Sequence, residues 1–235
     1  MNLSEHSRIT AIEPQARHKG RMNIFIDGEF AIGLAEAVVA GLHLKVGQAV
    51  TTERLREASA AEERHQATEA AYRLLSFRAR SGKELSDRLR QKGYEGAVID
   101  EVIARLSELG YLDDAAFASS WVSSRGTTRG SRLLSQELRL KGVDRETAAE
   151  TIREARDEET EAATALSVAI RRVGERPNDR TREAQAKLAA FLQRRGFGWD
   201  AIRPVLRRLY RSSAADEEGE DEANDLSEIA EERGD

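Results

Sequence analysis

The alternation of apolar and polar positions divides the chain into a short β-like part and a long helical part. Between residues 9 and 50 the apolar runs are short, and two of them flank Asp27-Gly28. An Asp-Gly pair readily adopts the positive φ angles of a tight two-residue turn, so this pattern predicts a β-hairpin over residues 23–32. Ile9 and Ile12 before the hairpin, with residues 42–50 after it, predict one more strand and a short helix near residues 35–40.

From about residue 51 the apolar positions recur with a period of 3.6, and the strong helix formers Ala, Leu, Glu and Arg dominate. Three segments come into register when Lys92-Gly93, Lys141-Gly142 and Arg195-Gly196 are aligned. In each segment two leucines four residues apart precede the basic residue, and an apolar residue follows the glycine. This pattern predicts a short helix that ends at a left-handed glycine, followed by a second helix. The leucine pairs are Leu85/Leu89, Leu134/Leu138 and Leu188/Leu192.

A further amphipathic stretch precedes each helix pair, at residues 63–79, 114–125 and 158–173. The chain therefore predicts a unit of three helices that occurs three times. Repeats about 50 residues long are typical of stacked units that form an elongated, curved array. In the second helices of the later pairs we expect Asp144 and Asp200 as N-caps and Pro204 in the first turn.

The predicted fold is thus mainly α, with a small N-terminal region that contains the β-hairpin and with an acidic C-terminal tail. We place the N-terminal β-rich region at residues 1–52. The three helical repeats follow, and the tail completes the chain. The predicted bounds of these later segments are residues 53–112, 113–156, 157–210 and 211–235.

Charge is distributed unevenly along the chain. The net charge is −5, but residues 211–235 hold 11 acidic and 2 basic residues, which leaves a net charge of +4 on residues 1–210. The tail has few large apolar side chains, so it cannot bury enough surface to offset the entropy of ordering, and we expect it to be disordered. Its role is either to keep the protein soluble or to act as an acidic competitor that shields the basic body or engages a partner.

The residue types exclude several classes of chemistry. The 235 residues include no Cys, which removes disulfides, iron–sulfur clusters and thiolate metal sites. The four His lie apart from any metal-ligand or catalytic partner, phosphate-binding glycine loops are missing, and Asp113-Asp114 is interpreted as a helix N-cap. No apolar run approaches the roughly 20 residues of a membrane span, and no leader peptide is recognised. We expect a cytoplasmic protein with no catalytic activity, cofactor or metal.

Basic residues concentrate where the first helix of a repeat ends and the leucine-pair helix begins. Between residues 125 and 141 five basic residues are opposed only by Glu137, and residues 78–83 carry a similar run. Superposed repeats would place both runs on one side as a stripe suited to phosphates or to an acidic protein. The simpler interpretation is a solvated helix face in a chain with 31 Arg and 6 Lys. The candidate residues are Arg78, Arg80, Lys83, Arg125, Arg129, Arg132, Arg139 and Lys141.

A helix-turn-helix DNA reader has the same order of helix, glycine-containing turn and helix. In this chain the turn occurs three times, and acidic residues such as Asp100 and Glu146 lie near the starts of the second helices, where phosphates would lie. No cluster of residues capable of base readout is found there. These features count against sequence-specific DNA recognition.

Several motifs resemble those of the RecX family of bacterial recombinase regulators. The first is Leu74-Leu75-Ser76-Phe77-Arg78-Ala79-Arg80-Ser81, and the next runs from Glu84-Leu85 to Lys92-Gly93-Tyr94. The N-terminal part resembles the longer members in residues 9–13 and 21–28. The similarity covers roughly residues 8–210 and is strongest over residues 72–142. A third motif is Leu109-Gly110-Tyr111-Leu112-Asp113-Asp114, followed by Phe117-Ala118.

The resemblance implies a monomeric, crescent-shaped protein of three three-helix repeats. Such proteins bind the RecA filament on single-stranded DNA, along its groove, and restrain its coprotease and strand-exchange activities, which tunes recombinational repair and the SOS response. The family supplies no short binding motif that could be transferred residue by residue, so the site residues depend on the charge pattern alone. The alternatives are a nonspecific DNA-binding helical-repeat protein that acts without the recombinase, and a plain interaction scaffold.

Overall fold

The computed structural model describes residues 7–210, so the predicted disordered tail lies outside the described residues. The chain divides into two compact units. The first consists of Met1–Arg80 and Glu84–Leu112, and the second of Ser81–Lys83 and Asp113–Asp235. The two units are described separately.

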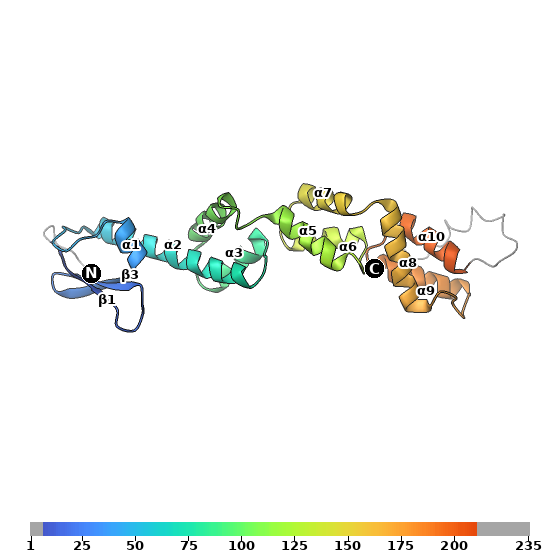
Figure 1. Ribbon diagram of the computed structural model, residues 1–235, viewed down its shortest axis with the longest axis horizontal. Coiled ribbons are helices and arrows are strands. Elements are labelled where there is room, and N and C mark those ends of the chain that lie inside the picture. The colour runs from blue at the N-terminus through green and yellow to red at the C-terminus, as the bar shows by residue number, and fades with distance from the viewer. Residues whose placement is uncertain (1–6, 211–235) are drawn as a thin grey trace. The chain divides into compact units, whose positions relative to one another are not determined.

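The first unit begins with a three-stranded antiparallel sheet, in the order β1 (Ile9–Pro14), β2 (Arg21–Ile26) and β3 (Glu29–Ala35) (Figure 1). Asp27 and Gly28 have φ angles of 53° and 89°, as the predicted hairpin turn requires. The predicted additional strand is β1, and the predicted short helix is α1 (Glu36–Gly41). Residues 42–50 contain no named strand; an isolated bridge between Arg8 and Ala49 and backbone hydrogen bonds to Ile9 join them to the start of β1.

A single long helix, α2 (Thr52–Phe77), joins the sheet to the first three-helix repeat. It begins well before the predicted stretch at residues 63–79, because Thr51 caps it by accepting a hydrogen bond from the amide of Arg54. Its early part packs against the sheet through Ala58, and its later part packs through Ala67 and Ala71 against the helices that follow. Phe77, the last residue of α2, is 83% exposed, although it falls within the amphipathic stretch predicted at residues 63–79.

A buried carboxylate fixes the sheet to α2. Glu62 accepts hydrogen bonds from the guanidinium of Arg21 at 2.7 Å, the amide of Ala35 at 2.6 Å and the side chain of Gln66 at 2.7 Å. Burial alone would raise the pKa of Glu62, but the three donors outweigh this effect and the pKa is lowered. The carboxylate is therefore held in its charged form at the point where the sheet meets the helix.

The first repeat is completed by α3 (Gly82–Gln91) and α4 (Gly96–Glu108). The second unit holds two further groups of three helices, which matches the predicted threefold repetition. Their cores are separate clusters, one centred on Leu134 and Leu138 and the other on Leu188 and Leu192. The helices are α5 (Asp114–Arg125), α6 (Ser131–Leu140), α7 (Arg145–Ala155), α8 (Glu158–Val173), α9 (Arg182–Arg194) and α10 (Trp199–Tyr210).

The predicted glycine caps are confirmed in all three repeats. Gly93, Gly142 and Gly196 have φ angles of 92°, 86° and 87°. The amide after each glycine reaches back to the carbonyl of the second leucine of the pair, as in the bonds from Val143 to Leu138 and from Phe197 to Leu192. The six leucines of the pairs are buried.

Two predictions about the last helix are wrong. Asp144 does cap α7 by accepting from the amide of Thr147, but Asp200 is not a cap, because α10 already begins at Trp199. Pro204 consequently lies in the second turn of α10 rather than in the first. There its missing N–H removes the usual donor to the carbonyl of Asp200.

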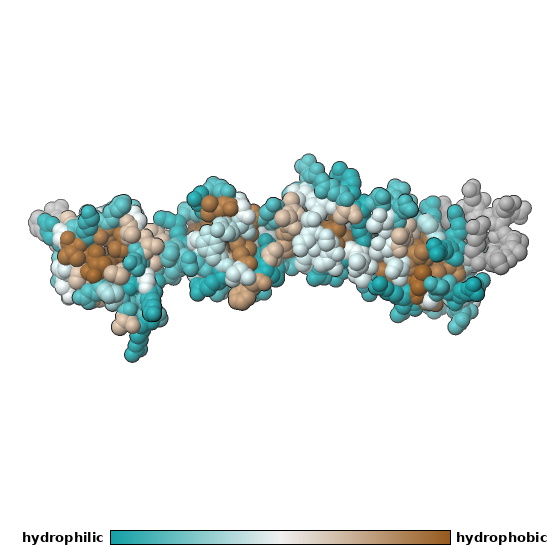
Figure 2. Space-filling view, in the orientation of Figure 1, coloured by the Kyte–Doolittle hydropathy of each residue, from teal (hydrophilic) through white to brown (hydrophobic). Residues whose placement is uncertain are grey.

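Hydrophilic side chains cover much of the visible face of each unit, with apolar side chains between them (Figure 2). Among residues 7–210 no helix combines the length and the apolar character needed to span a membrane. Within the same residues no group of three or more His, Asp or Glu side chains is arranged to hold a metal ion.

Candidate binding surface in the second unit

A tryptophan in α5 organises the basic residues of the second repeat. Trp121 and Arg125 lie four residues apart on one helix, which places the guanidinium carbon of Arg125 3.9 Å from the centre of the indole ring. The ammonium of Lys141 lies 5.1 Å from the same centre. Both cations are within the range of a cation–π interaction, and the buried ring of Phe117 packs 5.8 Å from the indole. The sequence-predicted residues Arg125 and Lys141 therefore share one aromatic platform.

Glu137, the single acidic residue of this run, is engaged twice. One carboxylate oxygen accepts a hydrogen bond from the indole N–H of Trp121 at 2.9 Å, and the other pairs with the guanidinium of Arg129. We call Trp121, Arg125, Arg129, Glu137 and Lys141 the Trp121 cluster. Its three cations and one carboxylate give it a net charge of +2.

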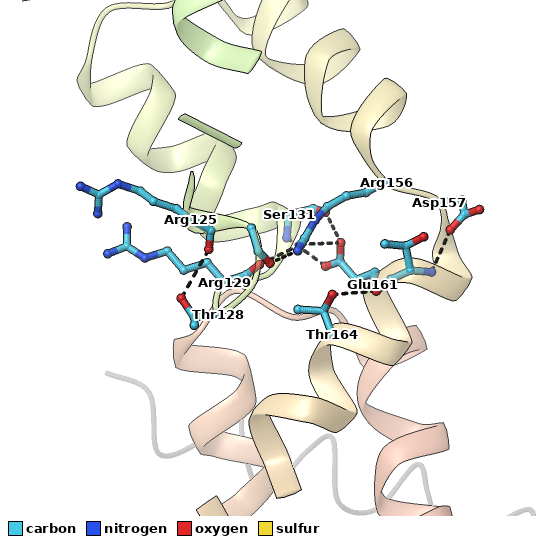
Figure 3. Close-up of polar contacts among 10 residues, drawn as sticks. Arg125, Thr128, Arg129, Ser131, Arg156, Asp157, Glu161 and Thr164 are labelled. Carbon is cyan, nitrogen blue, oxygen red and sulfur yellow. Dashed lines mark hydrogen bonds and ion pairs between the residues drawn. The ribbon is translucent and has the colours of Figure 1, made fainter. Parts of the chain in front are cut away.

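Arg129 lies close to two other arginines. Burial lowers its pKa, and repulsion from Arg125 and Arg195 lowers it further. An arginine keeps its proton at physiological pH, so three like charges stand near one another in the folded protein. Figure 3 shows the side chains of Arg125 and Arg129 extending in the same direction, away from the start of α8. A bound anion would relieve this repulsion.

The third repeat supplies a second aromatic ring with two cations. The guanidinium carbons of Arg172 and Arg195 lie 5.4 and 5.3 Å from the centre of the Phe191 ring. We call these three residues the Phe191 cluster, and the two clusters together the basic–aromatic band. Sequence reasoning missed the Phe191 cluster. A signal for Arg195 was available, because the repeat alignment pairs it with Lys141, but Arg172 has no such counterpart among the candidates.

Direct backbone contact brings the two clusters together. The amide of Gly130 donates to the carbonyl of Arg195 at 2.8 Å, and the amide of Arg132 donates to the carbonyl of Gly196 at 3.1 Å. A Cβ on Gly130 would lie 2.3 Å from the backbone of Gly196, so the contact requires a glycine here. The start of α6 therefore packs against the glycine cap of α9.

A second contact of the same kind lies at residues 81–83. The hydroxyl of Ser81 donates to the carbonyl of Lys141 at 2.5 Å, and a Cβ on Gly142 would lie 2.3 Å from the Cβ of Lys83. The repeat alignment pairs Ser81 with Gly130. The segments at Ser81 and Gly130 therefore pack against the aligned glycine caps at Gly142 and Gly196. The same contact occurs twice in the fold.

The α5–α6 link, which carries Arg129, is held from the interior by Arg156. This guanidinium donates to the carbonyls of Gly126 and Arg129, and its side chain is only 5% exposed. Burial lowers the pKa of Arg156, and the nearby carboxylate of Glu161, 3.6 Å away, opposes that shift. Figure 3 shows Arg156 and Glu161 meeting at this link. Sequence reasoning missed Arg156 because its partners lie about 30 residues away along the chain.

Carboxylates from the first helix of the next repeat, α5 or α8, also cap the starts of α3 and α6. Glu161 accepts from the amide of Ser131 at 2.9 Å and from its hydroxyl, and Asp114 accepts from the amide of Gly82 at 2.9 Å. Asp113 caps α5 by accepting from Ala116, which confirms the N-cap predicted for the Asp113-Asp114 pair. The two acidic residues therefore serve two different helices.

The other candidate residues lie outside the band. Arg132 and Arg139 are exposed on α6, with the guanidinium of Arg132 beside Gly198, and Lys83 packs over Gly142. Arg78 and Arg80 belong to the first unit, where Arg78 pairs with Glu84 at 2.8 Å and Arg80 donates to the carbonyl of Leu74. The single stripe that joins all eight residues stays a prediction.

Four models of one family match most of this chain. They are described as the RecX N-terminal domain, at residues 7–51, and as its first, second and third three-helix domains, at residues 67–106, 113–152 and 159–206. A regulatory protein RecX from Bacillus subtilis strain 168 is 32% identical over 216 residues, covering 90% of this chain and 81% of the relative. One from Clostridium botulinum strain Eklund 17B is 29% identical over 203 residues, covering 86% and 95%.

Two solved structures have a similar fold. A crystal structure of regulatory protein RecX is 24% identical and superposes with a TM-score of 0.71, covering 86% of this chain and 98% of that structure. The crystal structure of RecX from Lactobacillus salivarius is 25% identical, with a TM-score of 0.57, and covers 63% of this chain and 97% of that structure. The two solved structures therefore share the helical fold of this chain.

Proposed function

Because this chain belongs to the RecX family of regulatory proteins, we propose that it binds the RecA nucleoprotein filament and inhibits its recombinase, ATPase and coprotease activities. In this role it modulates DNA repair and the SOS response in the cytoplasm. It acts as a monomer and by binding, without a catalytic step or cofactor of its own. The observation that supports this proposal most directly is the basic–aromatic band of the second unit.

The chemistry of the band suits a nucleoprotein partner. Four cations lie against two aromatic rings, and a fifth, Arg129, pairs with Glu137, the one acidic member of the band. Arginine and aromatic side chains are enriched where protein interfaces gain most of their binding energy. Guanidinium groups also bind phosphate oxygens through paired hydrogen bonds. A filament of protein on single-stranded DNA offers acidic protein groups and phosphates, and both are ligands for this surface.

The test is the ATP hydrolysis of the cognate recombinase on single-stranded DNA, titrated with the full chain. We expect hydrolysis to fall as the protein approaches a stoichiometric ratio to the filament. An unchanged rate at that ratio would contradict the proposal. A modest amount of free duplex oligonucleotide added as competitor serves as a control, because an effect exerted through the filament should survive it.

A second candidate function is nonspecific DNA binding without the recombinase. It is supported by the same band, because stacked cations and aromatic rings also fit the backbone and bases of single-stranded DNA. The two functions are separated by an unrelated DNA-dependent ATPase in the same titration. Equal inhibition of both enzymes would favour the second function, whereas inhibition of the recombinase alone would favour the first.

A further inference from the structure

The loop that joins β1 to β2 is a separate basic element in the first unit. Residues 15–20 form this loop, and Arg17, His18 and Lys19 at its tip are all exposed. No acidic residue occurs between Gln15 and Met22. Figure 1 shows the loop as a projection of the two-stranded ribbon, and Figure 2 shows a hydrophilic projection at this place.

The base of the loop is fixed by contacts within the first unit. Gln15 donates to Asn23 at 2.8 Å, and the carbonyl of Gly20 accepts from the amide of Glu36 at 2.8 Å. Arg21, the next basic residue, donates to the carbonyl of Gly33 and pairs with the buried Glu62. The strands that carry the loop are therefore anchored to α2.

Within the part of the chain that the structure describes, the basic residues at the tip of the loop are unpaired, unlike the basic residue at its base. Among residues 7–210, the side chains of Arg17, His18 and Lys19 form no hydrogen bond or ion pair, whereas Arg21 is bound to Glu62. Arg17 and Lys19 carry like charges, which repel one another. Unpaired charges on an anchored projection are suited to an external polyanion.

We propose that the β1–β2 loop binds the phosphodiester backbone of DNA. The loop offers cationic groups but no aromatic or large aliphatic side chain, since Ala16 is its only apolar residue. Protein interfaces depend on buried aromatic or aliphatic anchors, and the loop lacks them. Contacts to phosphate need only positioned cations and carry no base information. This contact is additional to the band and does not depend on the proposed regulation of RecA.

The test is fluorescence anisotropy of the full chain with a labelled oligothymidine, measured from low to physiological NaCl. The variant Arg17→Ala/Lys19→Ala is compared with Lys45→Ala/Arg56→Ala, which removes the same charge from two exposed positions of the same unit. At 0.1 M salt we expect the loop variant to bind roughly 10-fold more weakly, with the slope of log K against log salt reduced by about 1.4. The control should stay within about twofold of the unaltered chain. A labelled duplex in a parallel arm shows whether the backbone of both forms is recognised.

Circular dichroism and urea unfolding check that both variants are folded, and Arg17→Glu/Lys19→Glu should weaken binding further. Equal affinities and slopes for the loop variant and the control would overturn the proposal. It would also be overturned if the loop variant bound DNA normally but lost affinity for the recombinase in the absence of DNA, because the ligand would then be an acidic protein surface. Neither outcome bears on whether the chain inhibits the filament, which the ATPase titration tests separately.

Discussion

Two basic runs occupy the same place in successive repeats, yet their side chains have different neighbours. Arg80 and Arg129 align in the repeat, and burial lowers the pKa of both. In the first unit, Arg80 donates to the carbonyl of Leu74 and its neighbour Arg78 pairs with Glu84. In the second unit, Arg129 also pairs with a carboxylate, that of Glu137, but it stands near Arg125 and Arg195, and Arg125 lies over the ring of Trp121.

The difference arises from neighbours that are distant in sequence. The guanidinium groups of the first run bind a carboxylate and backbone carbonyls a few residues away in the sequence. The second run gains Trp121 from the preceding helix, Arg195 from the third repeat and Arg156 from beneath. The same position in a repeat therefore meets different neighbours in the two copies, and only the second copy lies beside an aromatic ring with further cations.

The largest effect is expected from removal of the interior support of the second run. Arg156→Ala leaves Glu161 and two carbonyls without their buried partner, and we expect a loss of about 3 kcal/mol of unfolding free energy. The matched control is Arg153→Ala, an exposed residue of the same helix, which should change stability by less than about 0.5 kcal/mol. Urea unfolding followed by circular dichroism measures both. Equal stability of the two variants would show that Arg156 does not hold the link.

The next largest effect is expected on the affinity for the RecA filament, to which the two basic runs should contribute unequally. Arg125→Ala/Arg129→Ala should weaken binding to the RecA filament roughly 10-fold at 0.1 M salt and flatten its salt dependence, because two cations that meet the partner are lost. Arg78→Ala/Arg80→Ala removes the same charge from the first run and should change the affinity by less than about threefold. Filament affinity measured at several salt concentrations checks both. Equal losses from the two variants would instead support one continuous stripe.

The smallest effect concerns the aromatic platform. Trp121→Phe keeps a ring beneath Arg125 and Lys141 but weakens the cation–π contact and removes the donor to Glu137. We expect filament affinity to fall about twofold to threefold, by a free energy of roughly 0.5 kcal/mol. Trp199→Phe alters the other tryptophan, in α10, and should leave the affinity unchanged. If both substitutions had the same effect, the Trp121 platform would have no special role.

Turns and helix ends were predictable from the sequence because they depend on neighbouring residues. The Asp27-Gly28 turn, the glycine caps and the start of α5 at Asp114 each depend on residues a few positions apart. The errors have local causes too. Thr51 starts α2 earlier than its apolar periodicity indicates, and the start of α10 at Trp199 moves Asp200 and Pro204 further into the helix.

The candidate binding surface was predictable only in part. Charge density along the sequence identified Arg125, Arg129 and Lys141, which the structure brings to one aromatic ring or its carboxylate partner. The role of Arg195 depends on the seating of Gly130 on the next repeat, and that of Arg156 depends on carbonyls across the unit. Periodicity within a single sequence contains no signal for such long-range contacts.

We propose that the basic–aromatic band, rather than the basic run of the first unit, contacts the RecA filament. Amide hydrogen exchange of the full chain, free and bound to the filament on single-stranded DNA, tests it most directly. We expect slower exchange on binding at residues 126–130 and 194–198, with little change at residues 78–80. Protection of residues 78–80 without protection of the link between α5 and α6 would contradict the claim.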